Sequence, residues 1–154
     1  KDIGVSNKEA KHYIESYLAH YSGVDSYMKN VVEKANADGY VETMFGRRRN
    51  LPELTSSKHM IRAFGERVAR NMPIQGTAAD IIKIAMIKVY KELQKQGLEA
   101  KIVLQVHDEM MIEAPISEAD KVEEILKSNM ESAAKLDVPL VAEVSKAESW
   151  YDCK

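Results

Sequence analysis

The sequence predicts an α+β fold in which a small antiparallel sheet packs on helices. Three observations support this prediction. Helical periodicity fills most of the first 96 residues. Two short apolar runs then flank a polar tripeptide, which indicates a β-hairpin. The predicted order, two helices, a strand, two helices, the hairpin, a helix and a strand, lacks the regular alternation of a parallel α/β sheet.

Two helices open the chain. Ser6 followed by Glu9 matches the capping-box pattern and starts a helix that reaches about Tyr21. One stripe of this helix is apolar, so we expect it to be packed. A second helix begins near Val24 and ends at Gly39, because glycine favours the left-handed conformation that terminates helices.

The next segment predicts one strand and two helices. Residues 40–45 are rich in β-branched and aromatic side chains, so we expect a strand closed by a turn at Gly46. A helix over 57–71 should end before Pro73, since proline disfavours a helical residue before it. Another helix should run from Thr77 to about Gly97.

In the last third of the chain, helical periodicity gives way to short apolar runs. The apolar runs 101–106 and 110–114 have the length of strands, and the polar residues between them indicate the tip of a hairpin. A helix over 117–134 and a final strand over 140–144 complete the prediction.

Composition excludes several classes of protein. No apolar run approaches the length of about 18 residues that a membrane span requires, so we expect no membrane association. The single Cys153 excludes an internal disulfide and a zinc cluster, which favours a reducing, cytoplasmic setting. The chain starts at Lys1 without a methionine or a signal segment, and we interpret this as a cut inside a longer chain.

Charge is distributed unevenly along the sequence. Residues 47–70 carry seven basic and two acidic side chains, a balance of +5, whereas residues 108–152 carry twelve acidic side chains and four lysines, a balance of −8. A basic region beside an acidic one suits a protein that holds a polyanionic backbone in one place and cations in another. Two solvated faces of opposite charge are the alternative, which charge alone favours.

The predicted hairpin tip carries the sharpest local chemistry. His107, Asp108 and Glu109 lie between the two strands, where carboxylates are well supported for binding a metal. Oxygen ligands favour Mg²⁺ over zinc. We expect Asp108 as a direct ligand and Glu109 as a weaker, water-mediated one, because neighbouring strand residues point to opposite faces. Taken alone, such a triplet is more often a simple turn in which Asp108 bonds its own backbone.

Longer motifs favour the metal site over the simple turn. The segment Gln105–Glu109 resembles the third conserved motif of the family A DNA polymerases, and Glu66–Lys83 is similar to the segment that leads into the palm in that family. Shorter matches occur in the same order, so the resemblance covers essentially the whole chain. They are Gly39–Thr43, Gly46–Arg49, Leu51–Pro52, Asp137–Leu140 and Trp150–Asp152.

The resemblance implies a DNA-directed DNA polymerase that transfers nucleotides to a primer 3′-hydroxyl with two Mg²⁺ ions, which Mn²⁺ can replace. It implies that Asp108 and Glu109 are catalytic residues and metal ligands, and that His107 lies near the primer terminus. A lone histidine in such a turn is otherwise more often structural. It also implies that residues 1–45 end the fingers subdomain and residues 46–154 belong to the palm.

The resemblance further assigns DNA contacts. Arg67, Asn71 and Gln75 match residues that contact the template–primer duplex, and their spacing of four puts them on one helical face if the helix continues past Pro73. Arginine suits phosphates, and amides suit the minor-groove acceptors that every base pair offers. We also expect DNA contacts from the run that includes Arg47 and Arg48. The alternatives are a surface ion pair for Arg67, loop or helix-end roles for the amides, and a solvated turn for the arginine run.

One part of the family pattern is missing. The sequence contains no Asp-Tyr-Ser-Gln-Ile-Glu-type segment, which would supply the first metal-binding aspartate, and no nucleotide-binding fingers helix. We therefore expect the isolated chain not to polymerise DNA. Its expected partners are primer–template DNA, deoxynucleoside triphosphates and an N-terminal remainder, in the same chain or as a split partner, in the bacterial nucleoid. The alternatives are a non-catalytic nucleic-acid-binding module and an α+β interaction module.

Overall fold

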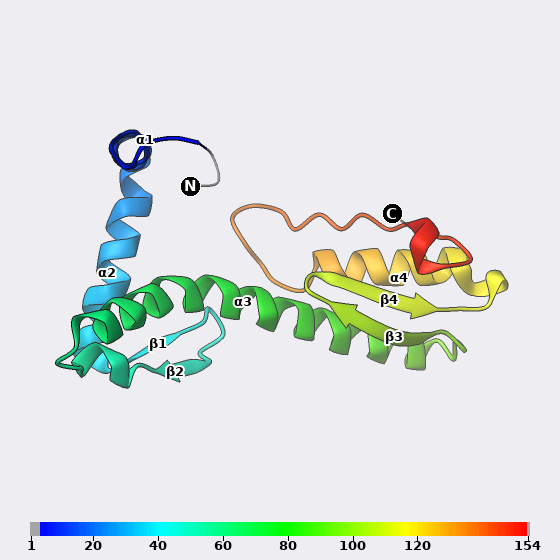
Figure 1. Ribbon diagram of the computed structural model, residues 1–154. Coiled ribbons are helices and arrows are strands. Elements are labelled where there is room, and N and C mark those ends of the chain that lie inside the picture. The colour runs from blue at the N-terminus through cyan, green and yellow to red at the C-terminus, as the bar shows by residue number, and fades with distance from the viewer. Residues whose placement is uncertain (1–3, 154) are drawn as a thin grey trace. The chain divides into compact units, whose positions relative to one another are not determined.

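The computed structural model describes residues 4–153, which form two compact units that meet between Gly76 and Thr77. The described residues combine helices with two separate two-stranded antiparallel sheets, which confirms the predicted α+β class (Figure 1). The long helix α3, His59–Lys95, contributes its first part to the first unit and its second part to the other.

The first unit begins with helices α1, Asn7–His20, and α2, Ser22–Asp38. The capping box predicted at Ser6 is present, because the Glu9 amide donates to Ser6 Oγ (3.3 Å) while the Glu9 carboxylate accepts from the Ser6 amide (2.9 Å). The predicted packing of the apolar stripe of α1 is wrong for the described chain. No α1 residue is buried, and Tyr13 and Tyr17 are 61% and 55% exposed.

A short hairpin follows α2. Strand β1, Tyr40–Glu42, pairs antiparallel with β2, Arg48–Asn50. The strand predicted over residues 40–45 is therefore shorter than expected, and its partner was not predicted. Arginine and asparagine give β2 no apolar alternation, so the turn and the core behind the hairpin determine the pairing.

The core of the first unit lies between this hairpin and the start of α3. Val41 on β1, Leu51 after β2 and Leu54 in the 3₁₀ turn Pro52–Thr55 pack with Ala69 of α3 and Ala35 of α2. Leu51 is almost fully buried. The hairpin thus turns one face to the core and the other to solvent.

The prediction that Pro73 ends a helix is wrong, because α3 continues through it to Lys95. Proline removes one helical hydrogen bond and typically costs about 3 kcal/mol inside a helix. Its fixed φ is nevertheless compatible with a helix, and burial of Ala69 on one side and Ala85 on the other holds both flanking stretches in place. Packing therefore overrides the local preference.

The second unit contains the predicted long hairpin. Strand β3, Lys101–Val106, pairs antiparallel with β4, Glu109–Glu113, and helix α4, Ala119–Glu131, follows a 3₁₀ turn at Ile116–Glu118. The sheet and α4 pack on the second part of α3 around one apolar cluster. Its buried members are Val89, Leu93, Ala100, Val122, Ile125 and Leu126.

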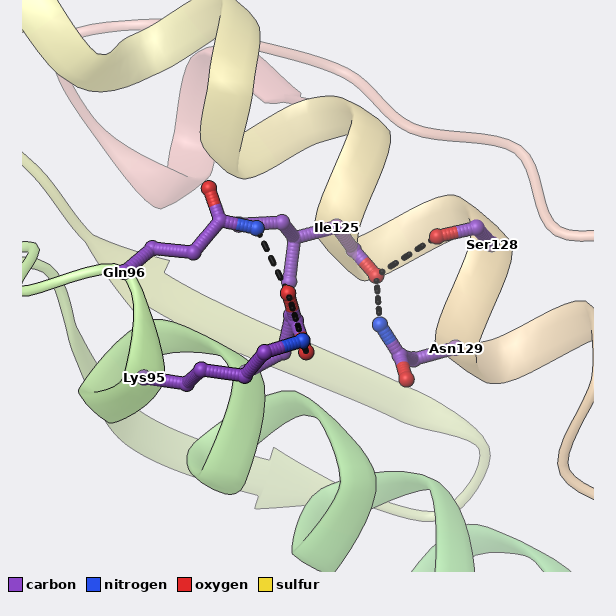
Figure 2. Close-up of polar contacts among 6 residues, drawn as sticks. Lys95, Gln96, Ile125, Ser128 and Asn129 are labelled. Atoms are coloured by element: carbon purple, nitrogen blue, oxygen red, sulfur yellow. Dashed lines mark hydrogen bonds and ion pairs between the residues drawn. The ribbon is translucent and has the colours of Figure 1, made fainter.

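Polar side chains form hydrogen bonds on both helices of this cluster, α3 and α4. At the end of α3, the Gln96 and Lys95 side chains bond to the Glu92 carboxylate, with the Gln96 contact at 2.7 Å. On α4, the Ser128 hydroxyl and the Asn129 amide both donate to the Ile125 carbonyl, the latter at 2.8 Å (Figure 2). These contacts satisfy the Glu92 carboxylate on α3 and the Ile125 carbonyl on α4.

The strand predicted over residues 140–144 is absent from the structure. This segment alternates as a strand would, since Leu140, Ala142 and Val144 are shielded while Val141 is 77% exposed. It pairs with neither sheet, and a strand requires a ladder partner. The Ala142 amide instead donates to the Glu131 carboxylate (3.2 Å). The described chain ends in the 3₁₀ turn Trp150–Cys153, and none of its described helices could cross a membrane.

Candidate functional site

The tip of the β3–β4 hairpin consists of His107 and Asp108 alone. Val106 pairs with Glu109, so the connection between the strands is a two-residue turn. All three predicted site residues at this tip, His107, Asp108 and Glu109, are exposed, and neither carboxylate is enclosed by apolar side chains. The hairpin therefore presents an imidazole and two adjacent carboxylates to solvent on a support made of paired strands.

His107 adopts a left-handed backbone conformation, with φ of 51°. A two-residue hairpin needs a positive φ at its first turn position, where glycine or asparagine is usual. The Gln105 side-chain amide donates to the His107 carbonyl at 2.6 Å and braces the turn from β3. Histidine adopts this conformation only at a steric cost. Strained residues of this kind cluster at functional sites, which favours a functional role for the His107 imidazole.

The two carboxylates of the tip are suitable ligands for Mg²⁺, but they form only part of a magnesium site. Carboxylate oxygens are the ligands Mg²⁺ prefers, and this ion is usually held by one or two carboxylates together with waters and substrate phosphates. Asp108 lies in the turn and Glu109 is the first residue of β4, so the two carboxylates start from different backbone settings. Within residues 4–153, no cluster of three or more His, Cys, Asp or Glu side chains is arranged to hold a metal.

The first unit holds the second group of predicted residues. Because α3 continues past Pro73, Arg67, Asn71 and Gln75 lie on one face of a continuous helix, and all three are exposed. The Arg67 guanidinium lies 5.8 Å from the centroid of the Phe64 ring. Sequence reasoning missed Phe64, which its position one turn before Arg67 could have indicated.

Two other arginines of α3, Arg62 and Arg70, bond to groups of the protein itself. Glu66, the residue before Arg67, bonds to Arg70 at 3.2 Å. Arg62 donates to the carbonyls of Ser56 (2.8 Å) and Ser57 (3.0 Å) and so fixes the loop before α3. These contacts separate structural cations from Arg67, whose side chain is on the exposed face.

The β1–β2 hairpin also comes close to α3, on a different side of the helix. Thr43, buried at the end of β1, accepts hydrogen bonds from the amides of Phe45 and Arg47 through its Oγ1, both at 3.2 Å. A Cβ placed on Gly76 would lie 2.7 Å from the Thr43 methyl. Only glycine at position 76 therefore lets the hairpin turn approach α3 this closely.

Two predicted groups, the arginine hairpin and the Arg67–Asn71–Gln75 face, belong to the first unit. Arg47 and Arg48 lie on an exposed hairpin that packs on the side of α3 that carries Gly76, whereas Arg67, Asn71 and Gln75 occupy a different, exposed face of the helix. The tip that carries His107, Asp108 and Glu109 belongs to the second unit. The described residues thus provide a basic and amide-bearing surface in one unit and an acidic tip in the other.

Comparison with known proteins gives consistent matches along the chain. Residues 1–152 match the family model described as DNA polymerase family A. The chain is 48% identical over 154 residues to DNA polymerase I of Caldicellulosiruptor bescii and 47% identical over 154 residues to DNA polymerase I of Bacillus subtilis. Both matches cover all of this chain and 18% of the relative.

A solved structure is similar over nearly the whole chain. It is described as the POL domain of Pol1 from M. smegmatis in complex with DNA primer-template and dNTP, and it matches with a TM-score of 0.95 and 44% sequence identity. The match covers 99% of this chain and 27% of that one. The chain therefore spans less than a fifth of the length of the curated relatives named above.

Proposed function

The chain belongs to DNA polymerase family A, and we propose that it forms the part of a DNA-directed DNA polymerase that carries one of two catalytic carboxylate motifs. The observation that carries this proposal is the exposed Asp108–Glu109 pair on a two-residue hairpin tip. Its sequence, Gln105–Glu109, resembles the third conserved motif of the family. The relatives' name and their high identity along the whole chain support the same assignment.

Asp108 is the proposed direct ligand of a catalytic Mg²⁺, and Glu109 is the accessory carboxylate that binds through water. When bound, a pair of Mg²⁺ ions would lower the pKa of the primer hydroxyl and neutralise charge on the reacting phosphates. A turn between paired strands restricts the movement of the Asp108 carboxylate, so the chain's own contribution is a negatively charged oxygen held in place. Mn²⁺ is expected to replace Mg²⁺ because it accepts the same ligands.

The other predicted residues bind DNA in this proposal. Arg67 contacts phosphates or sugars, and Asn71 and Gln75 contact minor-groove acceptors from the same helical face. An amide contact to those acceptors depends on base-pair geometry more than on sequence, which suits a template-directed enzyme. His107 donates to an oxygen near the primer terminus.

The arginines of the β1–β2 hairpin are a second DNA-binding group in this proposal. Arg47 and Arg48 are exposed on a hairpin that Gly76 allows to lie against α3. Phosphate contacts of this kind position the duplex and make binding sensitive to salt. We therefore assign both arginines to the nucleic-acid side of the site.

The chain acts in this proposal as part of a larger catalytic unit. Residues 1–45 form the end of the fingers subdomain, and residues 46–154 form the portion of the palm with the His-Asp-Glu motif. An N-terminal remainder, covalent or separate, supplies the first catalytic aspartate and the nucleotide-binding helix. The other partners are primer–template DNA and deoxynucleoside triphosphates, the two ligands bound in the M. smegmatis complex. Bacterial DNA lies in the cytoplasm, which is the proposed location.

Complementation tests the proposal. The 154-residue chain is mixed with the part of the C. bescii polymerase that precedes its match, and incorporation of a labelled nucleotide into a primer–template is measured with Mg²⁺. We expect incorporation by the mixture and none by either piece alone. Incorporation by the purified chain alone would contradict the proposed division of the site, and no synthesis by a mixture that forms a complex would contradict complementation.

A non-catalytic nucleic-acid-binding module is the alternative that the exposed face of α3 favours, because the whole basic surface lies in one unit. Such a module predicts duplex binding that is independent of divalent cations and a mixture that never synthesises DNA. Asp108→Asn separates the two functions. In a polymerase it abolishes synthesis and leaves duplex binding intact or tighter, whereas in a binding module there is no synthesis to lose.

A further inference from the structure

The solvent-facing side of the β1–β2 hairpin carries a group of three interacting side chains. Glu42 on β1 lies directly opposite Arg48 on β2, and Tyr40 lies two residues before Glu42 on the same side of β1. Directly opposite and diagonal neighbours on one face of a strand pair are within reach of each other. The alternate side, with Val41, packs in the core.

Both partners contact the Arg48 guanidinium. Its central carbon lies 4.4 Å from the centroid of the Tyr40 ring, and its Nε lies 3.1 Å from Glu42 Oε2. The ring therefore supports the flat face of the guanidinium, and the carboxylate bonds to its inner edge. The Arg48 side chain remains 61% exposed, more than the 37% of its carboxylate partner.

From this geometry we infer that Arg48 presents its two terminal nitrogens to one phosphate of bound DNA, and that Tyr40 and Glu42 are positioning residues that hold it ready. The inference rests on the proposed function and adds to it two residues that touch no substrate. A guanidinium can bind a phosphate through two parallel hydrogen bonds, and its terminal nitrogens provide that pair when Nε is already bonded. A long side chain fixed beforehand loses less freedom on binding.

A purely structural role makes a different prediction. If the three side chains only hold the short hairpin in register, Glu42→Gln should weaken DNA binding only by destabilising the folded chain, so the loss of binding should be accompanied by a lower Tm. If the carboxylate acts only through its charge, its removal should strengthen DNA binding, because it lowers the positive potential near the phosphates. Positioning predicts the opposite sign, and it predicts that the effect depends on Arg48.

The test is a double-mutant cycle with the full chain. Binding of a fluorescent primer–template duplex is measured by anisotropy for the wild type, Glu42→Gln, Arg48→Ala and the double variant, at several salt concentrations. We expect Arg48→Ala to weaken binding by about tenfold and to reduce the salt slope by about 0.9, the value for one phosphate contact. Glu42→Gln should weaken binding by about threefold in the wild type and not at all beside Arg48→Ala.

Matched variants of the other residues guard against a folding defect. Tyr40→Phe keeps the aromatic face and should bind DNA as the wild type does, whereas Tyr40→Leu should weaken binding by about threefold. Arg48→Lys keeps the charge but loses the planar fork, so it should behave more like Arg48→Ala than like the wild type. Equal binding by the two Tyr40 variants, or full binding by Arg48→Lys, would overturn the inference.

The outcomes separate this inference from the proposed function. Tighter binding by Glu42→Gln, or an equal effect of that change in both backgrounds, would overturn the positioning role while leaving the polymerase assignment in place. No measurable duplex binding by the wild-type chain would count against both. An Arg48-dependent loss with the Tyr40→Phe control intact would support both.

Discussion

The two hairpins of this chain have the same simple architecture and opposite chemistry. The β1–β2 hairpin has three-residue strands and exposes Arg47, Arg48 and Arg49, whereas the longer β3–β4 hairpin exposes Asp108 and Glu109 at its tip. The difference shows that a strand pair is a neutral support. The side chains at its turn and on its free face decide whether it attracts phosphates or cations.

The hairpins are also fixed in different ways. In the first, the Thr43 hydroxyl bonds the turn from inside and Gly76 lets the turn approach a helix. In the second, a two-residue turn forces His107 into a left-handed conformation, which the Gln105 side chain braces. The basic hairpin is thus positioned by packing, and the acidic tip is positioned by its own backbone. Three sets of substitutions test this contrast, and a fourth concerns the acidic residues of the second unit.

The largest effect is expected at the acidic tip. Asp108→Asn keeps the shape of the side chain and removes its charge, so in the complemented enzyme it should lower nucleotide incorporation by about 1,000-fold, equivalent to about 4 kcal/mol of transition-state stabilisation. Glu109→Gln, the matched change at the accessory position, should cost about tenfold. Steady-state incorporation rates at saturating Mg²⁺ give both values.

Duplex binding is the control for this pair. Both variants should bind primer–template at least as tightly as the wild type, because each removes a negative charge beside DNA. If Glu109→Gln lowered nucleotide incorporation more than Asp108→Asn, Glu109 would be the direct ligand and Asp108 the accessory carboxylate. Loss of duplex binding by Asp108→Asn would show that the two hairpins do not divide the work as described.

The packing of the basic hairpin is tested at Gly76. Gly→Ala inside a helix usually stabilises, but here the new methyl would lie 2.7 Å from the Thr43 methyl, so Gly76→Ala should destabilise the chain by about 1–3 kcal/mol and weaken duplex binding. Denaturant unfolding and anisotropy measure the two effects.

Thr43→Ser provides a specific rescue. It removes the methyl that obstructs the new side chain and keeps the hydroxyl that bonds Phe45 and Arg47. The double variant should therefore recover most of the lost stability and binding. A double variant no better than Gly76→Ala alone would mean that the hairpin is not held by this contact.

The strained turn of the acidic hairpin is tested at His107. His107→Gly and His107→Ala both remove the imidazole, but only glycine adopts a positive φ without a steric cost. The glycine variant should be more stable than the alanine variant by about 1 kcal/mol, as measured by thermal unfolding. Both should impair primer extension in the complemented enzyme to a similar degree. Extension rates that follow stability would instead make His107 a purely structural residue.

The smallest effect concerns acidic residues of the second unit that have a structural use. Lys146 bonds to Asp120 and Glu123, each at 2.6 Å, and so ties the C-terminal segment to α4. The hydrogen bond from Lys146 lowers the pKa of Asp120, and the same bond raises the pKa of Lys146. The contact therefore contributes above the ordinary pKa of the carboxyl and is lost as pH falls through its lowered value.

Lys146→Met should accordingly produce a small fall in Tm at about pH 7, where the contact is exposed and screened, and a progressively smaller fall at acidic pH as the pH drops through the lowered pKa of Asp120. Thermal unfolding of the wild type and the variant across this pH range measures the difference. An equal difference across the range would mean that Lys146 acts through packing and not through its charge. In that case the charges of Asp120 and Glu123 would not help to hold the C-terminal segment on α4.

The sequence predicted most elements of the fold because their signals are local. The capping box at Ser6, the helix end at Gly39 and the hairpin around His107 all depend on residues within a few positions of each other. Three features required tertiary information. Helix α3 passes Pro73 because distant burial holds both sides, β2 has no apolar pattern of its own, and residues 140–144 alternate like a strand but find no ladder partner.

The candidate site divides in the same way. Motif resemblance supplied its members, and the structure shows that Arg67, Asn71 and Gln75 share one exposed helical face, which depended on the helix continuing. The resemblance could not supply Tyr40 as a partner of Arg48, because that contact depends on strand register across a turn of unknown length.

The central claim, that the hairpin tip holds a divalent cation together with residues from outside this chain, can be measured directly. The ¹⁵N-labelled chain is assembled with the unlabelled N-terminal piece and primer–template, and Mn²⁺ is added at substoichiometric levels. Paramagnetic broadening should appear first at the amides of residues 107–110 and should disappear in Asp108→Asn. Broadening centred on Asp120 and Glu123, or unchanged by Asp108→Asn, would contradict the claim.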